Sequence, residues 1–319
     1  MRIAFIVDPL DHLKPYKDSS VAMMRAAQAA GHTVFAILQP SLHWATERGV
    51  CAKATRLTLL DADHPWYAEG GSAIEPLCAF EAIVMRKDPP FDMEYVASTW
   101  LLERAEAEGA HVFNSARALR DHSEKFSVAE FAQFAAPTLV ARDAERLGEF
   151  IGAHRDVVLK PLDGMGGIGV FRVREDDPNR NVIIETLTHD GQRTIMAQRF
   201  IPEIADGDKR ILIVGDKVVP YCLARIPMAG ETRGNLAVGG RGEARPLTPR
   251  DFEIAEALAP VFAERGLLFV GIDVIGDWLT EINVTSPTCM VEVKQQTGFD
   301  AAALFIHEVE AKVQKTEDR

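Results

Sequence analysis

Short apolar runs alternate with amphipathic segments over the first third of the chain. Residues 3–7 and 33–38 predict buried strands, and the alanine- and methionine-rich segment 21–30 between them predicts a helix. A strand, a helix and a second strand in this order predict a parallel sheet. The apolar run 80–85 adds a strand, and the charged amphipathic segment 94–108 adds a helix. This part of the chain is therefore expected to be an α/β domain built on a parallel sheet.

The middle of the chain predicts a smaller mixed unit. A helix is expected from Asp121 to Phe134, which places Lys125 in its first turn. A positive charge there opposes the helix dipole and indicates an anionic partner, although a contact with Glu124 or Asp121 is an alternative. The remaining predicted elements are a helix at 144–153 and strands at 137–140, 157–161, 170–173, 183–187 and 194–201.

The last part predicts a second sheet, with strands at 209–214, 218–225, 269–275 and 278–284 and a helix at 249–265. The glycine-rich segment 226–241, which contains Arg233 and Arg241, has the length and composition of a lid or a disordered segment rather than a rigid loop. The expected domains are an N-terminal domain, a small domain and a C-terminal domain, at residues 1–120, 121–203 and 204–319.

A glycine-rich loop lies at the centre of the small unit. Gly164-Met165-Gly166-Gly167-Ile168-Gly169 matches the G-x-G-x-x-G pattern of dinucleotide sites, but that pattern requires a helix after the last glycine. Here a run of strand formers follows, so a strand–loop–strand hairpin is favoured. Such a loop can offer backbone N–H groups to phosphates, with Lys160 adding a charge from the preceding strand. An ordinary glycine-rich hairpin with a surface lysine is the alternative.

Three polar residues interrupt two apolar strands near the C-terminus. Asp273 lies inside one run, and Glu281 and Asn283 lie two apart on the next, on the same face. If the two strands pair in register across the turn at residues 276–277, the three side chains meet. Such an oxygen-rich set suits Mg²⁺ held between protein carboxylates and nucleotide phosphates. The alternative is an exposed polar face on an edge hairpin.

Three arginines are further candidates. Arg86 follows the strand at 80–85, and ligands of open α/β sheets bind beyond the carboxyl ends of the strands. A solvated arginine paired with Asp88 is the competing interpretation. Arg210 and Arg225 lie within strand runs, where each must face solvent or meet an anion.

Composition narrows the class of protein. The chain has 319 residues and a net charge of −12, which argues against general binding to nucleic acid or anionic membranes. The first residues predict a strand rather than a signal peptide, and no apolar run approaches the ~20 residues of a membrane span. The four cysteines form no C-x-x-C pair and are expected to be reduced thiols of a cytoplasmic protein.

Six blocks spread along the chain resemble the prokaryotic glutathione synthetases, a family of ATP-grasp ligases. They are M-R-K-D-P-P-F-D (85–92), L-K-P-L-D-G-M-G-G (159–167), D-G-D-K-R (206–210), Y-C-L-A-R-I-P (221–227), G-E-T-R-G-N-L-A-V-G-G-R-G-E (230–243) and L-T-E-I-N-V-T-S-P-T (279–288). The resemblance implies an ATP-grasp fold: a pre-ATP-grasp parallel-sheet domain, a small glycine-loop domain and a C-terminal α+β domain.

The resemblance also implies roles for individual residues. Residues that match the ATP site are Lys125, Lys160, Gly164, Met165, Gly166, Gly167, Gln198, Arg199, Phe200, Ile201 and Asp208. Those that match the metal ligands are Asp273, Glu281 and Asn283. Those that match the peptide-substrate and acyl-phosphate site are Arg86, Arg210, Arg225 and Ser286, with Lys160, Arg210 and Arg225 as catalytic groups. Arg233 and Arg241 match the lid. Arg199-Phe200 departs from the more polar or tyrosine-bearing pair often found in the family.

The implied reaction joins γ-glutamylcysteine to glycine with ATP, through an acyl phosphate, and uses Mg²⁺ or Mn²⁺. The resemblance also implies a homo-oligomer, a tetramer. Two other functions stay open: ligation of a different carboxylate and amine, and regulatory ATP binding without turnover. The Asp273, Glu281 and Asn283 set argues against the second, because a pure binder has less need of metal-assisted transfer.

Overall fold

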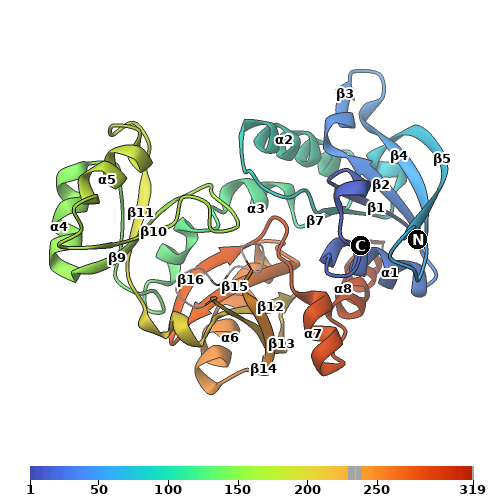
Figure 1. Ribbon diagram of the computed structural model, residues 1–319. Helices are drawn as coiled ribbons and strands as arrows, with labels where there is room; N and C mark the ends of the chain where they lie inside the picture. The colour runs from blue at the N-terminus through green and yellow to red at the C-terminus, as the bar shows by residue number, and fades with distance from the viewer. Residues whose placement is uncertain (229–233, 235–238, 318–319) are drawn as a thin grey trace.

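Three lobes, each built on its own sheet, make up the computed structural model of the chain (Figure 1). The structure describes residues 1–228, 234 and 239–317. Arg233, which is predicted to belong to a lid, lies outside this part of the chain. In Figure 1 the smallest lobe is at the left, the C-terminal sheet is at the lower centre, and the N-terminal sheet is at the right, where both chain ends also lie. The three sheets fall within residues 1–120, 121–203 and 204–319, which we keep as proposed domain boundaries.

The N-terminal sheet has a parallel centre and an antiparallel side. Its strand order is β3-β4-β2-β1-β6-β7, with β5 also paired to β4. The parallel strands are β1 (Arg2–Val7), β2 (Thr33–Leu38), β6 (Ala82–Met85) and β7 (Val112–Phe113). The antiparallel strands, which the sequence did not reveal, are β3 (His43–Ala45), β4 (Gly49–Leu59) and β5 (Tyr67–Pro76). Helices α1 (Ser19–Ala29) and α2 (Met93–Ala107) begin at side-chain caps from Asp18 and Asp92.

The small lobe is a four-stranded antiparallel sheet covered by two helices. Its order is β10-β9-β11-β8, from strands β8 (Thr138–Ala141), β9 (Asp156–Pro161), β10 (Phe171–Arg174) and β11 (Ile195–Arg199). The helices are α4 (Ala144–His154) and α5 (Arg180–Thr188). The strand predicted at 183–187 is wrong, because this segment lies inside α5. Ile184, Leu187 and Thr188 recur at helical spacing, and burial of that face outweighs the strand preference of adjacent isoleucines.

The helix predicted from Asp121 to Phe134 is also wrong. Helix α3 (Ala116–Asp121) ends where it was expected to begin, and a 3-10 helix, η4 (Phe126–Phe131), follows after a break. Lys125 therefore does not lie in the first turn of an α-helix, and the helix-dipole argument for it fails. The break arises because the Glu124 carbonyl accepts from Ile282 of strand β16 (Trp278–Asn283), and its carboxylate accepts from Val284 directly after that strand, instead of continuing a helix.

The C-terminal lobe is a five-stranded antiparallel sheet in the order β14-β13-β12-β15-β16. The strands are β12 (Asp208–Val214), β13 (Lys217–Ile226), β14 (Arg241–Pro246), β15 (Phe269–Ile275) and β16 (Trp278–Asn283). The helices are α6 (Pro249–Glu264), α7 (Met290–Thr297) and α8 (Ala301–Glu317), of which α8 packs against α1. None of the helices in the described part of the chain has the length and apolarity required to cross a membrane.

The lobes differ in how their hydrophobic cores are shared. Two of the buried clusters contain residues of both the N-terminal and the C-terminal lobes, for example Ile6 with Ile272 and Phe5 with Phe305. The third cluster lies wholly inside the small lobe, between its sheet and α4 and α5. The N-terminal and C-terminal lobes therefore form one platform, on which the small lobe rests.

Candidate active site

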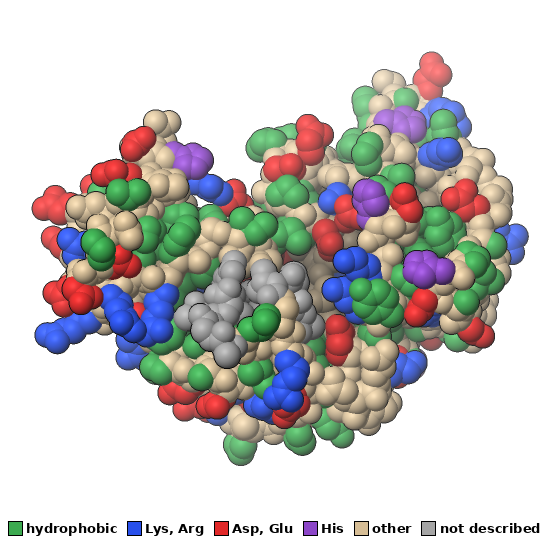
Figure 2. All heavy atoms as spheres, in the orientation of Figure 1, with side chains coloured by type: hydrophobic (Ala, Val, Ile, Leu, Met, Phe, Trp, Pro, Cys, Tyr) green, Lys and Arg blue, Asp and Glu red, His purple; other side chains and the backbone are tan. Residues whose placement is uncertain are grey.

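A cavity of about 670 Å³ lies where the three lobes meet. In Figure 2 the surface is indented between the small lobe at the left and the rest of the molecule. Among the predicted site residues that the structure describes, all except Arg86 and Arg241 line this cavity. The exposed Arg241 begins β14 and pairs with Glu243 at 3.2 Å. The structure therefore brings residues from distant parts of the chain to one site.

Strand alternation brings two small-lobe side chains into the cavity. On β9, Val157 and Leu159 face the core of the small lobe, so Val158 and Lys160, which alternate with them, face the opposite side. Gln198 lies on the same side from β11. The Lys160 Nζ donates to Gln198 Oε1 at 3.3 Å and to Thr280 O at 3.4 Å. Burial lowers the pKa of Lys160, because these neutral, distant acceptors replace little of its hydration.

The glycine loop joins β9 and β10 as the predicted hairpin, with Leu159 opposite Phe171. Gly166 and Gly167 have φ of 63° and 80°, a conformation that side chains with a Cβ adopt at a cost. A strand follows the loop, so the dinucleotide interpretation of the glycine pattern is excluded. The loop reaches the platform through Lys125, whose Nζ donates to Gly164 O at 2.5 Å.

Lys125 also connects the loop to the predicted metal site. Its Nζ lies 2.9 Å from Glu281 Oε1. Burial disfavours the charge on Lys125, but the Glu281 carboxylate outweighs this effect, so the pKa of Lys125 is raised. The structure therefore gives Lys125 an anionic partner, the Glu281 carboxylate of β16.

Cross-strand pairing arranges charges in rows on one face of the C-terminal sheet. Asp208 of β12 is opposite Arg225 of β13, while Arg210 is opposite Asp273 of β15, which is opposite Glu281 of β16. This is the register expected for the β15–β16 hairpin. The charged residues of this sheet face the cavity. The interpretation of the hairpin as an exposed polar face is therefore wrong, and so is the interpretation of Arg210 and Arg225 as solvated arginines.

The charges in these rows pair tightly. Arg210 contacts Asp273 through two nitrogens, and Arg225 Nη2 lies 2.5 Å from Asp208 Oδ2 and 2.8 Å from Asp273 Oδ2. Burial raises the pKa of Asp208 to about 6, in spite of Arg225. Burial also opposes the charge of Asp273, but its two arginines prevail and hold its pKa well below the usual range. Asp273 is therefore a permanent carboxylate.

The predicted metal ligands come together, although each has another partner here. Asn283 donates from Nδ2 to Asp273 Oδ2 at 3.3 Å and to Gly271 O at 3.2 Å. Within the described residues, no group of three His, Cys, Asp or Glu side chains is placed to hold a metal ion. The set of two carboxylates and one amide nevertheless fits Mg²⁺, which usually takes one or two protein carboxylates together with phosphate oxygens and water.

Arg86 lies behind the cavity wall rather than on it. It is 4% exposed, and it donates to Ser20 Oγ at 3.1 Å and to Pro287 O at 2.9 Å. The interpretation as a solvated loop arginine is therefore wrong. Burial lowers its pKa. Arg86 instead fixes the segment after β16, in which Ser286 lines the cavity and bonds the carboxylate of Asp88.

Sequence reasoning missed several residues of this cavity. Those from the N-terminal lobe are Asp8, Lys17, Asp18 and Asp88, and those from other elements are Glu124, Arg172 and Glu292. The rule that singled out Arg86 applies equally to residues after β1, at whose carboxyl end Asp8 lies. Arg172 gave no local signal, because its place depends on tertiary contacts. It stacks on Phe200, with the guanidinium 3.6 Å from the ring centre, and pairs with Asp156 at 2.6 Å.

Comparison with known proteins identifies the family. Residues 1–120 match the prokaryotic glutathione synthetase N-terminal domain, and residues 124–298 match the prokaryotic glutathione synthetase ATP-grasp domain. The chain belongs to the prokaryotic glutathione synthetase family. Among curated members, glutathione synthetase of Ralstonia nicotianae is 59% identical over 97% of this chain and 95% of its own. Glutathione synthetase of Nitrosomonas europaea is 55% identical over 98% of each.

Solved structures confirm the fold. The D-cycloserine synthetase DcsG superposes with a TM-score of 0.66 over 99% of both chains, at 16% identity. An ATP-grasp ligase of Chryseobacterium gregarium, in complex with ADP and peptides, gives 0.64 over 98% of this chain and 97% of that one, at 15% identity. At such identities the likeness concerns the fold alone. Together with the family match, it confirms the predicted ATP-grasp fold and an ATP-dependent ligase.

Proposed function

We propose that this protein is a glutathione synthetase, which converts ATP, γ-glutamylcysteine and glycine into glutathione, ADP and phosphate. The observation that carries this proposal is near full-length identity of 55–59% to curated glutathione synthetases, together with a cavity lined by the matching motifs. The arginines of the cavity favour a donor rich in carboxylates over an apolar one.

The charge of the cavity supports transfer of a phosphoryl group to a carboxylate. A carboxylate is a poor acyl donor, so ATP first converts it to an acyl phosphate, and both reactants are anions that repel each other. The cations Lys125, Lys160, Arg210 and Arg225 line the cavity around the predicted metal site. Held in place there, they can offset the repulsion between the two anions and align them.

We assign the divalent cation to Asp273, Glu281 and Asn283, with Mg²⁺ proposed and Mn²⁺ as the alternative. When bound, it would supply charge neutralisation at the nucleotide phosphates. Lys125 and Lys160 would then hold phosphate oxygens, and Arg210 would hold the carboxylate and the transferred group. The nucleotide would enter with its phosphates under the glycine loop and its base beside Gln198, Arg199, Phe200 and Ile201.

In the second step the amine of glycine attacks the acyl carbon, forming the C–N bond and releasing phosphate. Water would compete at this stage, and a closed cavity excludes it. A lid that includes Arg233 and Arg241 stays a prediction. A cytoplasmic location and a homotetramer, without nucleic acid or membrane as partners, are likewise proposed.

The test is ADP release from Mg-ATP with γ-glutamylcysteine alone, with glycine alone and with both. Release only with both, with glutathione formed in step, supports the proposal. Release with a different carboxylate and amine would identify another ligase of the same chemistry, and binding without release under any combination would indicate a regulatory protein. Chelation of divalent metal should abolish release, and Mg²⁺ or Mn²⁺ should restore it.

A further inference from the structure

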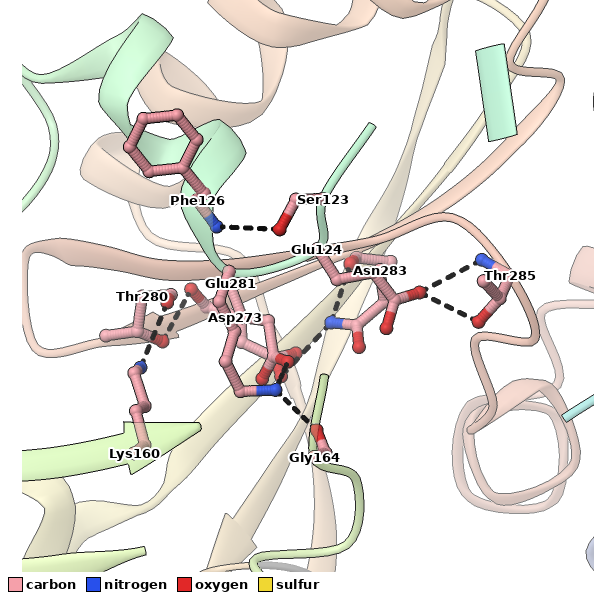
Figure 3. Close-up of polar contacts among 12 residues, drawn as sticks. Ser123, Glu124, Phe126, Lys160, Gly164, Asp273, Thr280, Glu281, Asn283 and Thr285 are labelled. Atoms are coloured by element: carbon pink, nitrogen blue, oxygen red, sulfur yellow. Dashed lines mark hydrogen bonds and ion pairs between the residues drawn. The ribbon is translucent and has the colours of Figure 1, made fainter. Parts of the chain in front are cut away.

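Glu124 precedes the phosphate-site candidate Lys125, and its side chain takes a different direction. Its Oε1 accepts hydrogen bonds from Val284 N at 2.9 Å, Thr285 N at 3.0 Å and Thr285 Oγ1 at 2.8 Å. Figure 3 shows the contact with Thr285, on the side of Glu124 away from Lys160. The Glu124 carbonyl accepts from Ile282 N at 2.8 Å. One residue thus binds β16 and the two residues directly after it at four points.

These bonds matter because β16 is the edge strand of its sheet. An edge strand has a row of backbone groups without strand partners. Here Glu124 accepts from one of them, Ile282 N, and from the N–H groups of Val284 and Thr285 directly after the strand. The strand carries Glu281 and Asn283, and the chain continues from it into Thr285, Ser286 and the residues that line the cavity. Loss of the carboxylate would therefore release the segment that begins at Val284, while the Glu124 carbonyl would still hold Ile282 of β16.

We propose that Glu124 is a positioning residue, which sets residues 284–288 for the peptide substrate while Lys125 holds the glycine loop. This inference rests on the proposed function and extends it. Glu124 acts through the backbone it holds, so it should govern the peptide substrate more than the nucleotide. The nucleotide side is set by Lys125, Lys160 and the small lobe, which Glu124 does not bond in the described structure.

Two variants of Glu124 test how strongly its side chain affects use of the peptide substrate. Glu124→Ala removes the acceptor of three bonds and should lower kcat/KM for γ-glutamylcysteine about 100-fold, the scale of a misplaced substrate group. Glu124→Gln keeps an oxygen acceptor but loses the charge, so a loss of about 10-fold or less is expected. In both, the Kd for an ATP analogue should stay within about 2-fold of the wild type, which a general loss of folding would not produce.

Glu130→Gln is the matched control, because it makes the same change on the neighbouring η4, where Glu130 pairs with Arg265 at the surface. It should leave every kinetic constant unchanged. Equal losses in peptide and nucleotide affinity for Glu124→Ala, or kinetics within 2-fold of the wild type, would overturn the inference. If the wild type makes no glutathione, the proposed function fails, and the positioning role is still decided without substrate. Hydrogen exchange in residues 282–288 should then be faster in both Glu124 variants than in Glu130→Gln, and equal rates would refute it.

Discussion

Lys125 and Lys160 bring the same charge into the cavity, but their protein contacts differ. Lys125 has two close acceptors, Gly164 O at 2.5 Å and the Glu281 carboxylate at 2.9 Å. Lys160 has distant neutral acceptors at 3.3 and 3.4 Å, and burial lowers its pKa. Substitution of each by Met removes the charge at similar length. The two variants should therefore differ in the stability of the free protein and agree in their loss of ATP affinity.

The magnitudes follow from these contacts. Lys125→Met leaves Glu281 without its cation, and loss of one partner of a mostly buried pair costs about 3 kcal/mol. Lys160→Met loses two weak bonds but also relieves the burial of a charge, so its stability should stay within about 1 kcal/mol of the wild type. In the complex each lysine gives a charge-assisted bond to phosphate worth about 1.5–3 kcal/mol, so each Kd for ATP should rise about 10- to 150-fold.

Urea unfolding without ligand and calorimetric titration with a magnesium-bound, non-hydrolysable ATP analogue measure the two quantities. Lys217→Met, at an exposed pair with Glu308, is the control and should leave ATP affinity unchanged. A stability loss for Lys160→Met equal to that for Lys125→Met would refute the reasoning about their surroundings. Wild-type affinity in both variants would remove the lysines from the phosphate site.

Three further predictions concern other buried charged or titratable groups. Burial lowers the pKa of His122 from 6.5 to about 4 in the folded protein. As the pH falls, His122 therefore takes up a proton in the unfolded chain before it does so in the folded one. Stability should be full above pH 6.5 and fall by up to about 3 kcal/mol toward pH 4, a dependence that His122→Leu should flatten in urea unfolding. Asp251 is fully buried, caps α6 with Thr248 and contacts Lys209, so Asp251→Ala should lower the free energy of unfolding by about 3–5 kcal/mol. Arg210→Ala should lower kcat/KM by about 10²–10³-fold while unfolding stays cooperative, and unchanged kinetics would exclude Arg210 from the mechanism.

The sequence predicted those parts of the site whose geometry is set by local pattern. The β15–β16 hairpin pairs Asp273 with Glu281 as expected, since two apolar runs joined by a short turn leave little choice of register. The glycine loop was also predictable, because Gly166 and Gly167 stand between two runs of strand formers. In both cases the residues that determine the shape lie within about twenty positions of each other.

Other parts depend on contacts between distant segments. The break after α3 arises because Glu124 bonds Val284, which follows β16 and lies 160 positions further along the chain. Nothing in the sequence near Glu124 indicates that bond. Arg86 was placed at the right edge of the sheet, but its burial behind Pro287 depends on how the C-terminal lobe packs. Strand β5 was not predicted because most of its residues are exposed. Its sequence therefore lacks the alternation of apolar and polar residues that identifies a half-buried strand.

The separate core of the small lobe has a consequence for how the protein loses its structure. The N-terminal and C-terminal lobes share buried clusters, so neither can unfold without exposing apolar surface of the other, whereas the cluster of Leu147, Ile151 and Leu159 is complete within the small lobe. Amide hydrogen exchange should therefore divide the molecule into two cooperative units, with the small lobe opening by itself at lower free energy. Nucleotide bound through Lys160 and Lys125 would join these units, so that ligand protects the amides of a lobe far beyond the atoms it touches.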